Sequence, residues 1–301
     1  MNPDAEIALT ELPPIRYNCP HDSQDSLDYN EVRVLHSGCR HAVRLARQRT
    51  LRVDANLRSC DIMESLLRHF AVAIHDVSPR FDREINVILK TIQPLLGKNM
   101  SAAIVPRWHE DCLRDAEVAW FQKHALFFNE LLLHGYKHYR SSGGKLVSWL
   151  TRRSDEFGAL SSEEVCRSIQ AAQADAISFF GFPLRGLVPP AWTLKSRIDE
   201  LPATGISFIH RFFSLECKDR RAVPTTTWSW DWGWAPGAGS VATKLAELRY
   251  RWHPSSVPVI AIHPADVRSN SLRFAKLAIQ KFLERRYEVI RFEAISELVE
   301  R

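Results

Sequence analysis

The sequence lacks the features that mark membrane-spanning, exported or disulfide-rich proteins. It has no run of about eighteen apolar residues, so no transmembrane segment is expected. Its first residues include the acids Asp4 and Glu6 and show no basic-then-apolar order, which argues against a secretory signal. The six cysteines are widely spaced and form no CxxC pair, so we expect reduced thiols rather than a disulfide framework. Together these absences predict a cytoplasmic protein.

Glycine-rich nucleotide loops are also missing. No GxGxxG, and no GxxxxGK followed by Ser or Thr, comes after an apolar run, which weighs against Rossmann and P-loop proteins. What is present suits a globular protein: 45% hydrophobic residues, including nine Trp and fifteen Phe, are enough to build a substantial core. The net charge of +5 is modest. The basic pairs Arg152-Arg153 and Arg285-Arg286 have no interleaved aromatics, so we expect solvated surface and no nucleic-acid site.

The first 62 residues differ from the rest of the chain. Residues 1–30 hold six acids and one Arg, whereas residues 31–62 hold seven Arg, no Lys and three acids. No strand–helix alternation is evident, so we expect a poorly ordered or irregular extension over 1–62, followed by a barrel domain over 63–301. A start of translation at Met63 is an open alternative. Residues 36–41 include metal-binding residue types, but no second half with zinc-finger spacing follows them.

From residue 69 onward, short apolar runs alternate with amphipathic stretches. The runs predict strands at 70–74, 102–105, 131–133, 186–188, 206–209, 257–262 and 287–290. Helical spacing is clearest over 81–96, 162–180 and 271–285. The alternation predicts an α/β protein with a parallel sheet covered by helices. Wholly apolar strands that end in polar residues favour a barrel over an open sheet.

Histidine and aspartate residues follow three of these predicted strands. His75 and Asp76 follow the first, His134 and His138 follow the third, and His263 follows the sixth. One such histidine is more often a core residue, but three strand ends at one barrel rim favour a shared site. If a helix begins at His134, the spacing of four residues puts both imidazoles on one face. Two histidines and Asp76 are typical ligands of a catalytic metal with open positions, and zinc suits them best.

Four motifs follow one another along the chain. They are Ile74-His75-Asp76-Val77-Ser78-Pro79, Glu130-Leu131-Leu132-Leu133-His134-Gly135-Tyr136-Lys137-His138, Val188-Pro189-Pro190-Ala191-Trp192 and Ile260-Ala261-Ile262-His263-Pro264. In this order they resemble the motifs of the polysaccharide deacetylase (NodB-homology) superfamily, and most closely its DUF2334-type branch. The resemblance covers roughly residues 69–301.

The resemblance implies a distorted (β/α)₇-type barrel of mostly parallel strands with helices outside. It implies metal ligation by Asp76, His134 and His138, general-acid catalysis by His263, and hydrolysis of an acetamido group on an amino sugar or glycoconjugate. A divalent ion polarises the amide carbonyl and lowers the pKa of its water toward ~7. An imidazole, with an ordinary pKa of about 6.5, suits protonation of the departing amine.

Two positions depart from the family pattern. His75 replaces the first carboxylate of an Asp-Asp pair, which is the family's usual general base, and Val188 replaces the arginine that orients it. His75 could accept the proton instead, or the base could be lost. Metal binding is therefore a safer inference than the reaction. Glu130 matches its motif, and we expect it to pair with a basic side chain in the barrel rather than to act in catalysis.

Tryptophan is concentrated in residues 227–234, where four indoles occupy alternating positions. On a strand they would share one face. Such a face could stack on sugar rings, or it could belong to the core. The resemblance implies that Asp231 and Trp232 line the substrate groove, and that Trp192 forms its wall or packs beneath the site.

The leading hypothesis is a metal-dependent hydrolase of C–N bonds that deacylates an amino sugar or glycoconjugate. The lack of an export signal favours a small or lipid-linked substrate over a wall polymer. One rival is a non-catalytic homologue that binds carbohydrate, and another is a hydrolase of a different amide or ester. The oligomeric state is left open.

Overall fold

The computed structural model describes residues 68–110, 115–139, 154–218, 222–231 and 239–300. All of them belong to one unit of the chain, Val53–Arg301. Several sequence interpretations concern residues outside this described part. They are the 1–62 extension, the start at Met63, the cluster at 36–41, the basic pair at 152–153 and the groove residue Trp232.

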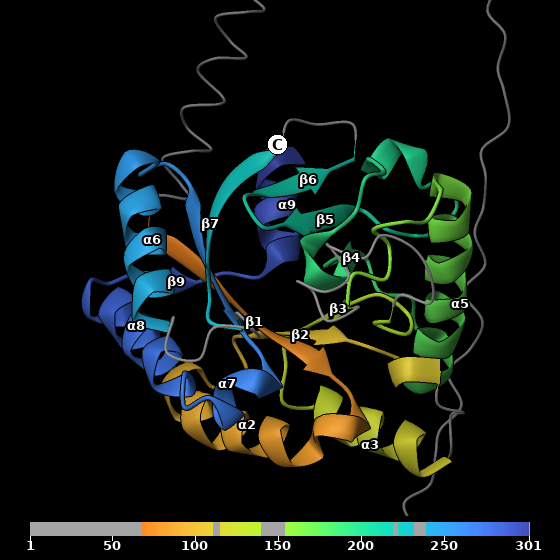
Figure 1. Cartoon of the computed structure of the whole chain (residues 1–301), viewed down its shortest axis with the longest axis horizontal. Coiled ribbons are helices and arrows are strands. Elements are labelled where there is room, and N and C mark those ends of the chain that lie inside the picture. Colours follow the sequence, from red (N-terminus) through yellow and green to blue (C-terminus); the bar gives the residue numbers. More distant parts are fainter. Residues whose placement is uncertain (1–67, 111–114, 140–153, 219–221, 232–238, 301) are drawn as a thin grey trace, which may run out of the picture. The chain divides into compact units, whose positions relative to one another are not determined.

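Nine strands in the described part of the chain form one sheet, and eight of them close into a ring (Figure 1). Neighbours in the ring follow chain order from β1 to β8, and β1 then pairs with both β8 and β2. The strands are β1 (His69–Val77), β2 (Ser101–Ile104), β3 (Glu130–Leu133), β4 (Gly186–Leu187), β5 (Phe208–Arg211), β6 (Ser214–Cys217), β7 (Val223–Ser229), β8 (Val257–Ile262) and β9 (Glu288–Val289).

Neighbouring strands in the ring are parallel except at β6, which is antiparallel to both β5 and β7. The β5–β6 hairpin distorts an otherwise regular barrel. The short strand β9 lies outside the ring, where it pairs with the first two residues of β1. The predicted distorted barrel of mostly parallel strands is therefore confirmed.

The helices α2, α5, α6 and α8 lie outside the ring and cover its strands (Figure 1). In the described residues the α-helices are α2 (Asp82–Leu96), α3 (Asp115–Ala125), α5 (Ser162–Phe180), α6 (Gly239–Trp252), α7 (Pro264–Arg268), α8 (Leu272–Glu284) and α9 (Phe292–Glu300). Short 3₁₀ turns are η1 (Pro79–Phe81), η2 (Trp108–Glu110), η3 (Pro190–Trp192) and η4 (Ile198–Glu200). None of these helices is long and apolar enough to cross a membrane.

The two faces of the sheet build two hydrophobic clusters, because side chains alternate along each strand. In β1, Ala71 and Ala73 face the barrel interior, whereas Phe70, Val72 and Ile74 pack outward with the helices. The interior cluster also includes two residues of α9, Phe292 and Ile295. The barrel interior is therefore packed mainly with apolar side chains, and the fully buried His210 lies among them with its ring 4.8 Å from that of Phe292.

Glu130 joins α9 to the barrel. Its carboxylate oxygens accept hydrogen bonds from the backbone N–H groups of Phe292 (3.1 Å) and Glu293 (2.7 Å). The Ser101 hydroxyl donates a further bond. A negative charge at a helix amino terminus is favourable, because the unpaired N–H groups there carry partial positive charge. The predicted basic partner is therefore wrong, and Glu130 instead holds the start of a helix.

Candidate metal centre

Asp76 leaves the regular alternation of β1 at the carboxyl end of the strand. The pairing of β1 with β2 shifts register between Ile74 and Val77, and Asp76 has a φ of 54°. This left-handed conformation is uncommon for residues other than glycine. A bulge of this kind re-aims a side chain and is frequent beside functional sites. The Asp76 side chain is buried near the ends of the neighbouring strands, with only 12% of its surface exposed.

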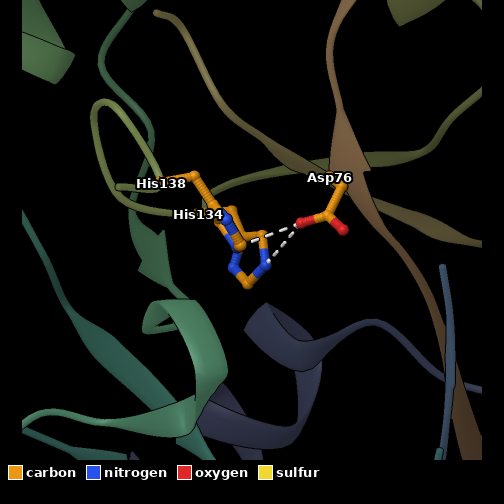
Figure 2. A group of neighbouring side chains, drawn as sticks. All are labelled: Asp76, His134 and His138. Carbon is orange, nitrogen blue, oxygen red and sulfur yellow. Dashed lines mark ion pairs between the residues drawn. The ribbon is translucent and has the colours of Figure 1, made fainter. Parts of the chain in front are cut away.

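Three side chains converge at this rim (Figure 2). The Oδ1 atom of Asp76 lies 3.3 Å from Nε2 of His134 and 3.1 Å from Nε2 of His138. One potential ligand atom from each of the three lies within 4.8 Å of the others, and all three residues are buried. The structure thus brings together the three residues that the sequence predicts as ligands.

The three potential ligand atoms suit a shared metal ion better than they suit hydrogen bonds to one another. Among the described residues, Oδ1 of Asp76 is buried and has no hydrogen-bond partner of good geometry, although two imidazole nitrogens face it. Buried polar atoms are rarely left unpaired without a functional reason. A carboxylate and two imidazoles are suitable ligands for zinc and several other divalent ions. The residues present therefore suit a bound cation.

A hydrogen bond at Nδ1 of His134 determines which of its ring nitrogens can bind a metal. Its Nδ1 atom lies 2.7 Å from the backbone carbonyl oxygen of Val188, to which an Nδ1 proton can be donated. This tautomer leaves the unprotonated Nε2 facing Asp76. Val188 lacks the charge of the arginine that the sequence resemblance implies at this position, yet its backbone carbonyl orients one of the proposed ligands.

The electrostatics of the trio give protonation states suited to metal binding. Burial raises the pKa of Asp76, but the facing imidazoles of His138 and His134 outweigh this and hold the pKa below its ordinary value. Burial lowers the pKa of His138 to about 3, although Asp76 opposes the shift. At neutral pH the site therefore presents an ionised carboxylate and a neutral His138 imidazole.

The segment from His134 to His138 is a loop, so the predicted helical turn is wrong. Gly135 and His138 have φ values of 76° and 53°, which lie outside the helical region, and residues 136–138 form bends. The two imidazoles converge because of this folded loop, and not because of helical spacing.

Glu156 holds this loop, and sequence reasoning missed it. One of its oxygens, Oε2, accepts hydrogen bonds from the backbone N–H groups of Tyr136 (3.0 Å), Lys137 (3.1 Å) and His138 (2.8 Å). The Ser168 hydroxyl of α5 donates to the other oxygen at 2.9 Å. No local pattern marks Glu156, because its partners are backbone groups about twenty residues earlier.

His263 lies after β8, at the amino-terminal cap of α7. Its backbone N–H donates to Oδ2 of Asp266 at 2.8 Å, and its Nδ1 lies 3.8 Å from the same atom. Burial acts to lower the pKa of His263, but the carboxylates of Asp266, Asp231 and Asp76 raise it to about 9. At neutral pH His263 is therefore an imidazolium and a potential proton donor.

His75 lies between the metal ligands and His263. Its ring centroid is 4.7 Å from that of His134 and 4.6 Å from that of His263. The side chain is fully buried, and neither ring nitrogen has a hydrogen-bond partner among the described residues. Burial and the neighbouring His263 lower the pKa of His75, which keeps it neutral.

Two of the three predicted groove residues lie in the described part of the chain. The ring of Trp192 lies 5.3 Å from His75 and 5.9 Å from His263. Asp231 is exposed, and its charge contributes to the raised pKa of His263. Both therefore lie beside the site.

Two other tryptophans of the Trp-rich segment belong to the core. Trp228 is 3% and Trp230 is 4% exposed, and both join the outward-facing hydrophobic cluster. Nε1 of Trp230 donates to Oγ1 of Thr243 on α6 at 2.9 Å. For these two residues the core alternative is confirmed, and a continuous indole face on the groove is wrong.

A further aromatic residue, which the sequence did not mark as part of the site, contacts the loop from His134 to His138, called the ligand loop below. Trp108, in the 3₁₀ turn after β2, stacks on the ring of His138 with centroids 4.9 Å apart and planes at 15°. His109, next in the turn, donates its backbone N–H to the Lys137 carbonyl at 2.9 Å. The segment after β2 therefore forms part of the site wall.

Two cavities of the described residues lie away from this site. One, of about 530 Å³, is lined by α3 and α5 residues such as Gln122 and Phe179. The other, of about 500 Å³, is lined by α6 and α8 residues such as Tyr250 and Phe274. Neither is lined by a predicted site residue, so the polar convergence at the rim identifies the site better than cavity size does.

Comparisons with known proteins give structural similarity only. No protein-family model matches the chain, and no curated protein matches its sequence. Among solved structures, it is similar to the Xyl-CE4 domain of a multidomain xylanase from the hindgut metagenome of Trinervitermes trinervoides, with 10% identity, a TM-score of 0.47, and coverage of 76% of this chain and 90% of that one.

Two further similarities are to bacterial proteins. One is to a CE4 family pseudoenzyme from Bacillus anthracis, with 16% identity, a TM-score of 0.46, and coverage of 74% of this chain and 63% of that one. The other is to a peptidoglycan deacetylase from Bacillus subtilis, with 15% identity, a TM-score of 0.44, and coverage of 77% and 92%. At this identity they assign neither a branch such as the DUF2334 type nor an activity to this chain.

Proposed function

We propose that this chain is a metal-dependent hydrolase of C–N bonds that removes an acetyl group from an amino sugar or glycoconjugate. One observation carries the proposal: an ionised carboxylate and two imidazoles converge in a buried position near a protonated histidine. A metal site and an acid are the two parts that amide hydrolysis needs, because the carbonyl must be polarised and the amine must leave protonated.

Asp76, His134 and His138 are the proposed ligands, and zinc is the proposed ion. A divalent ion held there supplies a Lewis acid for the amide carbonyl and an acidified water as the nucleophile. Asp76 would contribute negative charge to such an ion, and the Val188 carbonyl leaves Nε2 of His134 free to ligate it.

The two remaining histidines are proposed to move protons. His263, protonated at neutral pH, donates to the amine nitrogen as the C–N bond breaks, and Asp266 stabilises its charge. His75 is neutral and lies beside His134, so it has a free lone pair that can accept a proton from the attacking water, although its lowered pKa makes it a weaker base than an ordinary imidazole. In this scheme His75 takes the place of the carboxylate base that the family resemblance implies.

The substrate is proposed to bind over Trp192, Asp231 and Trp232. The Trp192 ring lies close to both His75 and His263, where an indole can pack against a sugar ring. The exposed Asp231 carboxylate can accept hydrogen bonds from sugar hydroxyls.

Acetate release from a panel of N-acetylated sugars, measured with the zinc-loaded protein, tests the proposal. Asp76→Asn and His263→Gln should abolish or strongly reduce turnover. His124→Gln is the matched control, because His124 is equally buried but lies on α3 and stacks on Trp120. Full activity in Asp76→Asn, or no release from any sugar by the unmodified protein, would contradict it.

A second candidate is a non-catalytic protein that binds carbohydrate through the same groove. The hydrogen bonding of His75 favours this alternative: neither ring nitrogen has a partner among the described residues, so nothing in that part of the chain orients it as a base. Zinc binding and sugar binding without acetate release would favour this candidate. Turnover that survives in His75→Ala would instead show that another group is the base.

A further inference from the structure

We propose that Glu156 is a positioning residue that holds His138 at metal-binding distance through the backbone of the ligand loop. The inference rests on the proposed metal site and adds a residue that neither the ligand motif nor the acid–base pair includes.

Three consecutive backbone N–H groups, from Tyr136 to His138, point at a single oxygen of Glu156. Successive N–H groups in such a turn form a concave site for an anion. Here the chain fills that concavity with its own carboxylate, which is 7% exposed. Each of these bonds pairs a backbone N–H group of the loop, so the Glu156 side chain fixes the path of the loop together with the bond from the His109 N–H to the Lys137 carbonyl.

The two histidine ligands differ in what orients them. The His134 ring has its own partner, the Val188 carbonyl, 2.7 Å from Nδ1. Nδ1 of His138, in contrast, has no hydrogen-bond partner among the described residues. Its ring is placed by stacking on Trp108 and by the position of its own backbone. The shortest of the three backbone bonds to Oε2 comes from the N–H of His138 itself.

Packing around Gly135 fixes Glu156 in turn. A Cβ atom at Gly135 would collide with Oε2 of Glu156 and would lie 2.6 Å from Cγ of Pro190. The Ser168 hydroxyl ties the other carboxylate oxygen to α5. The carboxylate is therefore wedged between the ligand loop and a helix, and a shift of either would move His138.

Glu130 is a matched control within the same chain. It is also buried, and its carboxylate also accepts backbone N–H bonds and a serine hydroxyl bond. Its partners, however, are the first residues of α9 and not the ligand loop. Loss of either carboxylate leaves buried N–H groups unpaired, but only the loss of Glu156 should disturb the metal ligands.

The test measures Zn²⁺ affinity by chelator competition, and the visible absorption spectrum of the Co²⁺-loaded full chain, for Glu156→Ala, Glu156→Gln, Glu130→Ala and Glu130→Gln. Urea unfolding in excess chelator reports the stability of each variant without metal. We expect Glu156→Ala to bind Zn²⁺ about 10–100-fold more weakly and to alter the Co²⁺ spectrum. Glu156→Gln, which keeps an acceptor oxygen but loses the charge, should be intermediate. Both Glu130 variants should lose stability and keep the affinity and spectrum of the unmodified protein.

An unchanged Zn²⁺ affinity and Co²⁺ spectrum in Glu156→Ala would overturn the inference and leave the metal site intact. Equal losses of affinity in the Glu130 variants would also overturn it, because the effect would then follow general stability. If Glu156→Ala does not fold, Glu156→Gln and Ser168→Ala carry the same expectation in weaker form. No metal binding by the unmodified protein would overturn both this inference and the proposed function.

Discussion

Replacing Gly135 with alanine tests how tightly the ligand loop is packed. Gly135 has a φ of 76°, a conformation that costs other residues about 1–2 kcal/mol. The added Cβ would also collide with Glu156 and crowd Pro190, and overpacking of this kind costs about 1–3 kcal/mol. We therefore expect Gly135→Ala to lower the free energy of unfolding by about 2–5 kcal/mol.

A matched variant at Gly181 distinguishes the backbone cost of the positive φ from the packing cost of the added Cβ. Its φ is 79°, nearly that of Gly135, but a Cβ there would meet no atom within 4 Å. Gly181→Ala should thus lose only the backbone part, about 1–2 kcal/mol, and should keep its metal affinity. Urea unfolding of the metal-free proteins gives the stabilities, and chelator competition gives the Zn²⁺ affinities. Equal losses of stability in the two variants, with equal affinities, would refute the packing argument.

Three further predictions concern buried groups. Burial lowers the pKa of His263, but the nearby carboxylates outweigh this and raise it to about 9, so acetate release should fall as the pH rises through about 9. His263→Gln should remove this alkaline limb of the pH–rate profile and slow turnover about 10²–10⁴-fold. Burial lowers the pKa of His210 to about 3, whereas the same imidazole in the unfolded chain has its ordinary pKa of about 6.5. Between these values only the unfolded chain binds the proton, so the free energy of unfolding should fall by about 2 kcal/mol from pH 7 to pH 5. Urea unfolding of His210→Leu at the two pH values should lack this contribution. Trp230→Phe removes the hydrogen bond to Thr243 and should lower the free energy of unfolding by about 0.5–1.5 kcal/mol without changing sugar binding. Weaker sugar binding of this variant in calorimetry would show that Trp230 contributes to the substrate groove.

The barrel could be predicted because its parallel strands are apolar on both faces. The run at 70–74 becomes β1, and the run at 257–262 becomes β8, since both lie between the barrel interior and the helices. The hairpin strand β6 and the strand β7 were harder to predict. β7 contains Pro224 and three consecutive threonines, a pattern that does not resemble a buried strand, although most of its residues are buried.

The candidate ligands could be predicted because the barrel gathers strand ends at one rim. Asp76 lies at the end of β1 and His134 follows β3, and only β2 separates these strands in the ring, so their positions at strand ends were enough to suggest a shared site. How His138 reaches them could not be predicted from spacing. It depends on a left-handed Gly135 and on backbone bonds to Glu156, and neither leaves a periodic signal in the sequence.

The partner of Glu130 shows a similar limit. A buried acid next to a strand suggests an ion pair, and the sequence contains many basic residues. The structure pairs Glu130 with the first N–H groups of α9, more than 160 residues later in the chain. Backbone donors are present at almost every position, so no residue type marks them as partners.

The most direct test of the metal centre is an anomalous difference map from crystals of the protein grown with Zn²⁺. The account predicts one strong peak, about 2.0–2.2 Å from a carboxylate oxygen of Asp76 and from the Nε2 atoms of His134 and His138. The absence of a peak at this position, or ligation that bypasses Asp76, would contradict it.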